Sequence, residues 1–345
     1  MDTSATTPPT ADRAQSTGRD LTPTSVPWAA VATFAVLACG LAWLVQLPLW
    51  LSGDGLRSPL FLPLTAVMMF TPTVASLVVM RFMLRPAHPS RYLGLTGVSI
   101  KRTIIVGLLA TVGWLCLGFA AMLAADVVGV ISVDWSNPTL ALPVDQLPDD
   151  LTEQALILVT FAALPANVVI ASIPAFGEEL GWRGFLTTAL APLGFTKAAL
   201  LSGVLWGIWH APIILLGYNF ARPGLDGLLL MCGFTISVGV LLQWARYYTR
   251  GVWAAAIGHG ALNASATLPL IWIPQGSDLA FSSILGIPGW IAIAALAAIM
   301  VAAGLFSHRL PQPLILAPTP KSQTTAGTTS HPFASELNAD EANNQ

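Results

Sequence analysis

Three short polar motifs interrupt a chain that is otherwise strongly apolar, and their residue types are those of acid–base chemistry. In chain order they are Glu178-Glu179-Leu-Gly-Trp-Arg183, Trp206-Gly-Ile-Trp-His210 and His259-Gly-Ala-Leu-Asn263. An ionisable side chain costs several kcal/mol in hydrocarbon unless it is paired or faces a polar cavity. Because all three motifs lie in neighbouring apolar segments, they predict one shared functional site.

The spacing within the first motif separates its two carboxylates. Glu179 and Arg183 are four residues apart, so on a helix they share a face and can form an ion pair. Glu178 is rotated by about 100° from Glu179 around a helix, so the two glutamates cannot do the same work. Arg183 is expected to neutralise one glutamate and to leave the other facing a cavity. A packing salt bridge or a position at the cytoplasmic surface is the simpler alternative for this motif alone.

The two histidine motifs also follow helical spacing. His210 is the thirteenth residue of its apolar segment, about 18 Å along a helix, and Trp206 lies one turn earlier on the same face. His259 and Asn263 share a face of a later segment, and the small residues around them let neighbouring helices approach closely. Polar bonding between helices would explain either motif alone, but not all three together.

Two kinds of hydrolytic site fit these residues. In the first, a carboxylate beside an imidazole activates water, while a second imidazole and an amide stabilise an oxyanion. In the second, His210, His259 and Glu178 hold a catalytic divalent metal such as zinc. Neither the HExxH zinc-protease signature nor a GxSxG serine context is present. Both kinds of site lead to amide hydrolysis.

The composition places these motifs in a membrane. Of the 345 residues 54% are hydrophobic and only 9% are charged, against about 25% in a soluble domain. The predicted fold is an all-α, polytopic membrane protein of about eight transmembrane helices, with the site among the fourth, fifth and seventh. The expected spans are Trp28–Trp50, Leu60–Leu84, Thr103–Val128, Gln154–Phe176, Ala198–Gly217, Leu225–Gln243, Val252–Ile273 and Ile284–Phe306.

Pro165 and Pro174 can kink the fourth span, and residues 154–190 are apolar for too long to form one upright helix. The organisation expected along the chain is a disordered tail (1–26), helices one to three (27–153), a catalytic membrane domain (154–274), a last helix (275–306) and a second disordered tail (307–345). No basic block indicates nucleic acid, and nothing indicates an oligomeric state.

Basic residues alternate along the loops as the positive-inside rule requires. The loop 81–102 holds five Lys or Arg residues, whereas the loop 131–153 holds none and is acidic. Of 15 Lys and Arg residues, only Arg57 and Arg222 fall on the predicted outer side. The expected location is therefore the cell membrane, with both termini cytoplasmic and the motifs close to the cytoplasmic side.

The three motifs, in this order, resemble the CPBP family of intramembrane proteases. This is the family of CAAX prenyl endopeptidases and bacteriocin-processing (Abi) proteins, and the segment Glu-Glu-Leu-Gly-Trp-Arg-Gly-Phe-Leu is similar to its bacterial branch. The resemblance covers residues 160–272, about a third of the chain. It implies a membrane endopeptidase whose partners are the lipid bilayer and a peptide or membrane-protein substrate.

The resemblance also implies a role for each motif residue. Glu178 would activate water with His210 as its partner, and His259 and Asn263 would complete the site as oxyanion stabilisers or partly as metal ligands. Glu179 and Arg183 would hold the motif helix in place. The family's second motif usually begins with Phe, so Trp206 is expected to alter the shape of the pocket without removing activity.

Other functions are weaker interpretations of the same residues. A non-enzymatic immunity or scaffolding protein could retain the fold, but such a protein would be expected to lose one of the catalytic positions. A transporter would need a polar path to the outer face and repeated broken helices, which the first three spans do not offer. Prenylated proteins, leader peptides, bacteriocins and membrane regulators all stay open as substrates.

Overall fold

The computed structural model describes residues 23–136, 138 and 152–306, and this part of the chain is helical without a β-strand. The predicted all-α fold class is thereby confirmed. The tails expected at 1–26 and 307–345 lie outside the described residues, apart from 23–26, and so does most of the acidic loop 131–153. The expected domain boundaries stay predictions.

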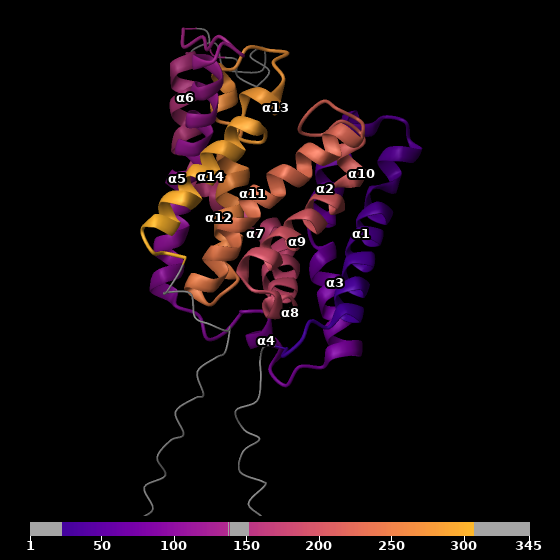
Figure 1. Ribbon diagram of the computed structural model, residues 1–345. Coiled ribbons are helices and arrows are strands. Elements are labelled where there is room, and N and C mark those ends of the chain that lie inside the picture. The colour runs from indigo at the N-terminus through magenta and orange to yellow at the C-terminus, as the bar shows by residue number, and fades with distance from the viewer. Residues whose placement is uncertain (1–22, 137, 139–151, 307–345) are drawn as a thin grey trace, which may run out of the picture. The chain divides into compact units, whose positions relative to one another are not determined.

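Within the described residues, five helical segments are long and apolar enough to cross a membrane, which makes the chain a multi-pass membrane protein (Figure 1). They are α1 (Trp28–Leu51), α2 and α3 with the π-helical turn that follows them (together Phe61–Leu84), α5 (Ile100–Val127), α11 (Leu225–Thr249) and α13 with α14 (together Leu279–Ala302). A bent pair makes a sixth if it is taken as one span: it joins α6 (Glu153–Ala162) to the segment Leu164–Ala189, which begins with α7 (Leu164–Glu179).

The expected count of eight spans is not confirmed, because two of the expected spans are shorter helices. These are α9 (Phe195–Trp209, 15 residues) and α12 (Trp253–Ser265, 13 residues). Proline explains the early endings. Pro212 lies in the first turn of the short helix α10 (Ala211–Ile214), and Pro269 begins a 3₁₀ turn after α12.

The remaining elements are short. Their bounds are α2 (Phe61–Met68), α3 (Thr71–Val79), α4 (Pro89–Tyr92), α8 (Thr187–Ala189), α13 (Leu279–Ser282) and α14 (Ile287–Ala302), with π-helical turns at Met80–Leu84 and Leu180–Leu186. Two more 3₁₀ turns lie at Gly55–Arg57 and Ala191–Leu193.

The helix pair that carries the first motif bends by 50° at residue 163. Pro165 explains the bend, because proline is tolerated in the first turn of α7 but has no N–H to donate to the Phe161 carbonyl of α6. Pro174 lies inside α7 without ending it. Of the two prolines expected to kink this segment, the first is therefore the one at the break.

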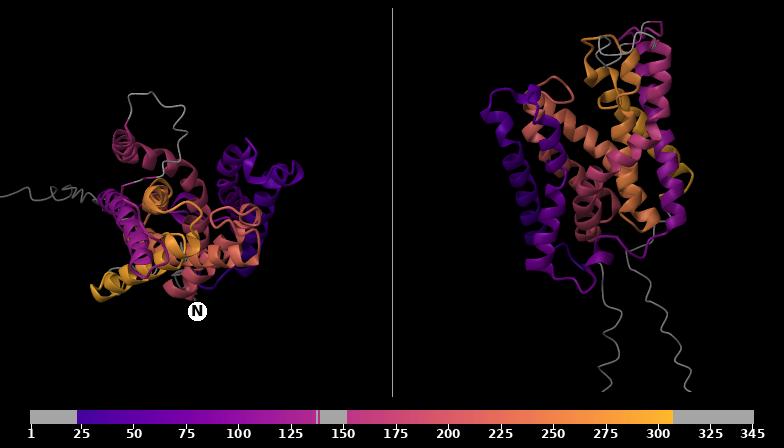
Figure 2. Two further views of the ribbon diagram at one scale, coloured as in Figure 1. Left: turned by 90° about the horizontal axis from the view of Figure 1, so that it is seen from above. Right: turned by 180° about the vertical axis from the view of Figure 1, so that it is seen from behind.

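Hydrogen bonds between distant segments define two ends of the helix bundle. At the α4 end, the Thr188 hydroxyl donates to the Tyr92 carbonyl at 2.8 Å and the Val252 amide donates to the Gly94 carbonyl at 3.0 Å. At the α10 end, the Trp50 indole donates to the Pro212 carbonyl at 2.9 Å and Arg222 pairs with Asp278. Figures 1 and 2 show the same separation, with α4 at one end and α10 and α13 at the other.

Charge is divided sharply between these two ends. The α4 end carries basic side chains and none of the described acidic ones, and its basic residues are Arg81, Arg85, Arg91, Lys101, Arg102, Lys197, Arg246 and Arg250. The α10 end carries the described acidic residues that lie outside the motifs, Asp54, Asp126, Asp134, Asp226 and Asp278, with Arg57 and Arg222. By the positive-inside rule, the α4 end is predicted to be cytoplasmic.

The helices that carry the motifs pack very closely, as the small residues around His259 predicted. A β-carbon placed on Gly260 in α12 would lie 2.6 Å from the Cα of Ser172 in α7. Real β-carbons do not approach backbone atoms so closely, so α12 can only reach this position on α7 because residue 260 is glycine.

We expect Gly260→Ala to lower the melting temperature of the purified protein in detergent. Overpacking costs about 1–3 kcal/mol where the neighbour is backbone that cannot move aside. Gly40→Ala is the matched control, because Gly40 lies inside α1 with no atom within 4 Å of its added β-carbon. This control should stabilise the helix by about 0.5–1 kcal/mol. Equal effects of the two variants would contradict the close packing.

Candidate active site

The first motif lies where α7 changes into a π-helical turn. Glu178 and Glu179 are the last residues of α7, and Arg183 lies in the turn Leu180–Leu186. Residues 177–190 are all buried, and both carboxylates and the guanidinium are at most 2% exposed. Charges this deeply buried require partners within the protein.

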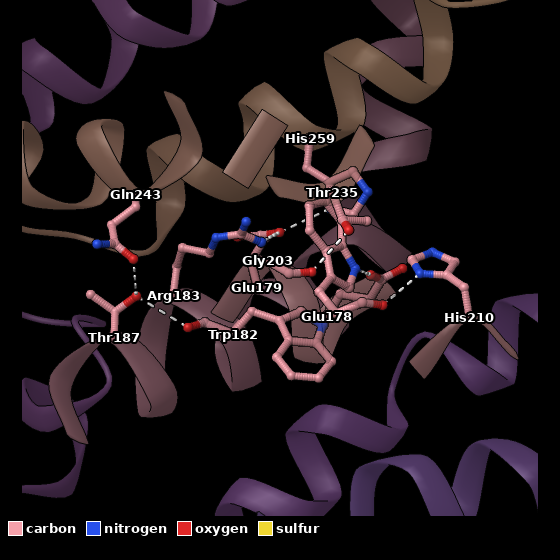
Figure 3. A network of polar contacts seen from close by, with 11 residues as sticks. Glu178, Glu179, Trp182, Arg183, Thr187, Gly203, His210, Thr235, Gln243 and His259 are labelled. Atoms are coloured by element: carbon pink, nitrogen blue, oxygen red, sulfur yellow. Dashed lines mark hydrogen bonds and ion pairs between the residues drawn. The ribbon is translucent and has the colours of Figure 1, made fainter. Parts of the chain in front are cut away.

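Glu179 contacts two other polar side chains of the motifs, Arg183 and His259 (Figure 3). Its Oε1 accepts a hydrogen bond from Arg183 Nη1 at 2.8 Å and lies 3.0 Å from Nδ1 of His259. The ion pair expected between Glu179 and Arg183 is thus present, and the contact with His259 was not expected. An ionised carboxylate only accepts hydrogen bonds, so Nδ1 of His259 carries the proton and Nε2 is left with a free lone pair.

Trp206 connects the remaining groups. Its indole Nε1 donates to Glu178 Oε2 at 2.6 Å, and its backbone carbonyl lies 2.8 Å from Nδ1 of His210. The guanidinium of Arg183 lies 4.4 Å from the centre of the Trp206 ring, and the His259 ring meets it edge-on at 5.1 Å. Trp206 therefore fixes both Glu178 and His210, whereas the sequence indicated only its position beside His210.

The orientation of His210 follows from the end of α9. This helix ends at Trp209, and His210 is its first residue beyond the end. A carbonyl oxygen only accepts, so Nδ1 of His210 must donate to Trp206, and its Nε2 is left with a free lone pair. Both imidazoles consequently have an unbonded Nε2, and each Nδ1 is fixed by the protein.

Glu178, His210, His259 and Asn263 line one cavity of about 260 Å³. The four residues expected to be catalytic thus meet at one place, whereas Glu179 and Arg183 lie behind it and do not line the cavity. Asn263 is exposed, one helical turn beyond His259 on α12, and its side chain makes no hydrogen bond to the described residues. Most of the other lining residues are apolar.

These residues do not have the arrangement of a preformed metal centre. Within the described part of the chain, no three His, Cys, Asp or Glu side chains are grouped closely enough to hold a metal ion. The expected ligands Glu178, His210 and His259 all line the cavity, and each has one protein contact, but they do not form such a group. We therefore derive no chemical step through a metal.

Several supporting residues could not be identified from the motifs. The Trp209 indole donates to Thr71 Oγ1 at 2.9 Å and so connects α9 with α3. Arg246 is buried and its Nε donates to the Arg183 carbonyl at 3.0 Å. A buried arginine near the end of α11 was visible in the sequence only as one of the residues of the positive-inside pattern.

Comparison with known proteins agrees with the motifs. Residues 160–265 match the model of a family described as type II CAAX prenyl endopeptidase Rce1-like. A similar curated protein is the CAAX prenyl protease 2 of Methanococcus maripaludis, which is 28% identical over 97 residues, 26% of this chain and 36% of the relative. The chain thus matches about a third of the relative's length. All three motifs lie within residues 160–265, and the family predicted from them is confirmed.

The contacts of the two glutamates predict different effects on stability. Glu179→Gln removes the charge that neutralises Arg183, and breaking a buried ion pair costs about 3–5 kcal/mol. Glu178→Gln is the matched control, because a glutamine oxygen can still accept the Trp206 hydrogen bond beside the cavity. In thermal unfolding in one detergent, only Glu179→Gln should lower the melting temperature strongly. Equal shifts would contradict the assignment of Glu179 to the buried ion pair.

Proposed function

Because residues 160–265 belong to the Rce1-like CAAX prenyl endopeptidase family, we propose that the chain is an intramembrane endopeptidase. It hydrolyses a peptide bond of a membrane-associated protein or peptide. The observation that supports this most is the convergence of one carboxylate, two oriented imidazoles and an amide on a single cavity among apolar helices. Burying such a set of groups among apolar helices is costly and therefore indicates a function.

Glu178 is the group that activates water in this proposal. Its Oε2 accepts a hydrogen bond from the Trp206 indole, whereas its Oε1 has no hydrogen-bond partner within the described part of the chain. The carboxylate takes a proton from a water molecule, whose oxygen then attacks the carbonyl carbon of the substrate. His210 lines the cavity and has a free Nε2, which accepts this proton from Glu178. As the C–N bond breaks, His210 passes the proton to the leaving amine nitrogen.

His259 and Asn263 stabilise the oxyanion that forms during attack. The amide of Asn263 donates a hydrogen bond to the oxyanion, and His259 donates from Nε2 only while that nitrogen carries a second proton in addition to the one on Nδ1. The Glu179 carboxylate at 3.0 Å stabilises that imidazolium and keeps the ring in place. In this proposal Glu178 and His210 transfer protons, His259 and Asn263 stabilise the developing charge, and Glu179 and Arg183 orient the site.

Replacing the proposed base should abolish substrate cleavage while the protein is still expressed and inserted into the membrane. We expect Glu178→Gln to lower the rate of substrate cleavage at least 10²-fold, because general acid–base catalysis contributes about 10²–10⁴-fold. Asp226→Asn is the control for the same chemical exchange, since Asp226 lies at the α10 end outside the cavity. Cleavage at the wild-type rate by an inserted Glu178→Gln protein would refute the role of Glu178.

His259→Ala tests the oxyanion site separately. Losing one oxyanion donor costs about 10²–10³-fold in turnover, so cleavage should fall by that factor while membrane insertion is retained. Quantifying the processed product against the amount of inserted protein measures both. A His259→Ala protein with unchanged turnover would contradict this assignment.

A metal-assisted version makes a distinct prediction. If Glu178, His210 and His259 hold zinc in the active protein, elemental analysis of purified and active enzyme must find about one equivalent of metal, and a chelator must abolish turnover. Turnover by protein without stoichiometric metal would establish the water-only route. The same assay with Glu178→Gln shows whether any bound metal depends on that carboxylate.

A further inference from the structure

The cavity extends from the motifs toward one end of the molecule. Its lining beyond the motifs includes Tyr218 and Asn219, which follow α10, Thr267 and Leu270, which follow α12, and Leu285, which precedes α14. Each of these segments belongs to the α10 end, as shown by the bonds of Trp50 to Pro212 and of Arg222 to Asp278. The most exposed lining residues, Asn263 and Thr267, lie in this direction as well.

The opposite direction is closed by packed protein. Residues 177–190 are buried without interruption and lie between the site and the α4 end. Polar bonds fix residues 177–190 to their surroundings: Thr188 donates to the Tyr92 carbonyl, Arg246 donates to the Arg183 carbonyl, and Thr187 donates to the Gln243 side-chain oxygen. No residue of the α4 end lines the cavity.

The distribution of charge indicates which end of the helix bundle lies on which side of the membrane. Every described Lys and Arg outside the site belongs to the α4 end except Arg57 and Arg222. Such an asymmetry places the α4 end in the cytoplasm. The sequence alone suggested that substrate is cleaved near the cytoplasmic side, because the motifs lie close to Lys197, Arg246 and Arg250. The cavity, however, opens away from these residues.

We propose that the substrate reaches Glu178 from the extracytoplasmic side of the membrane. This inference rests on the proposed function for the reaction itself, but it concerns the side from which the cavity is entered. It assigns the substrate to peptide segments that are exposed at the outer face, such as those of exported or membrane-inserted proteins. A protein confined to the cytoplasm cannot present a peptide bond to this opening.

The lining of the cavity defines the chemistry of that segment. Apart from Glu178 and the two histidines, it contains no charged side chain, and its apolar residues include Met68, Ile213, Met231 and Phe234. Polar groups are few, and one of them, the buried hydroxyl of Thr65, has no partner among the described residues. An uncharged, apolar peptide segment fits such a lining, because its backbone can bond to the few polar groups.

Cysteine labelling tests the side of entry. In a background in which Cys39, Cys116 and Cys232 are replaced by alanine, Thr267→Cys places a thiol in the cavity lining at the α10 end. Lys101→Cys is the matched control, because Lys101 is exposed at the α4 end. A membrane-impermeant maleimide is added to right-side-out and to inside-out vesicles, and total thiol is measured after denaturation.

We expect at least tenfold more labelling of Thr267→Cys in right-side-out vesicles than in inside-out vesicles, and the reverse for Lys101→Cys. Labelling of Thr267→Cys only in inside-out vesicles would overturn the proposal. Absence of labelling from both sides would overturn it too, because an open cavity must expose this thiol. Labelling of both variants from the same side would contradict the charge-based orientation and with it the proposal.

A second measurement separates this inference from the proposed function. New protein N-termini that require Glu178 are compared between cells with the wild-type and the Glu178→Gln protein. If cleavage is lost but the termini map to cytoplasmic segments, the side of entry is wrong and the protease assignment stands. If labelling comes from outside but no terminus depends on Glu178, the cavity faces outward and the protease assignment fails.

Discussion

One buried carboxylate determines how the rest of the site is arranged. Glu179 neutralises a guanidinium that is 1% exposed and at the same time holds an imidazole from a helix distant in the chain. Without this charge, Arg183 would lie uncompensated among apolar helices at a cost of several kcal/mol. The position of the Arg183 guanidinium and the orientation of the His259 ring both depend on it. The neighbouring Glu178 can face the cavity because Glu179 has taken the positive partner.

Local geometry was predictable from the sequence, and tertiary geometry was not. The ion pair of Glu179 and Arg183 follows from a spacing of four residues, which fixes their separation on a helix. The contact of Glu179 with His259 joins residues 80 positions apart and depends on how α12 packs on α7. Trp206 was recognised as a neighbour of His210, but the direction of its indole toward Glu178 is set by the packing of α9. Spacing predicted which residues meet, whereas packing decides which atoms bond.

The limits of the membrane prediction have a similar cause. Hydropathy identified every apolar segment, and each contains a helix in the structure. It does not detect where a backbone stops being helical, so α9 and α12 were expected to be longer than they are. Loop charge distinguished the two ends of the bundle from sequence alone. The opening of the cavity could not be predicted, because it depends on which side chains from six separate segments leave space between them.

The short helices have a consequence for the surrounding lipid. At about 1.5 Å per residue, α9 is about 22 Å long and α12 about 20 Å, against about 30 Å for the hydrocarbon core. A bilayer meets such a mismatch by thinning locally, at a cost of fractions of a kcal/mol per ångström. We therefore expect the water–lipid boundary to bend inward beside α9, whose Leu200, Val204 and Ile208 are exposed. A peptide bond moving from water to this site crosses less hydrocarbon than the thickness of the membrane suggests, and the water that hydrolyses it has a shorter route.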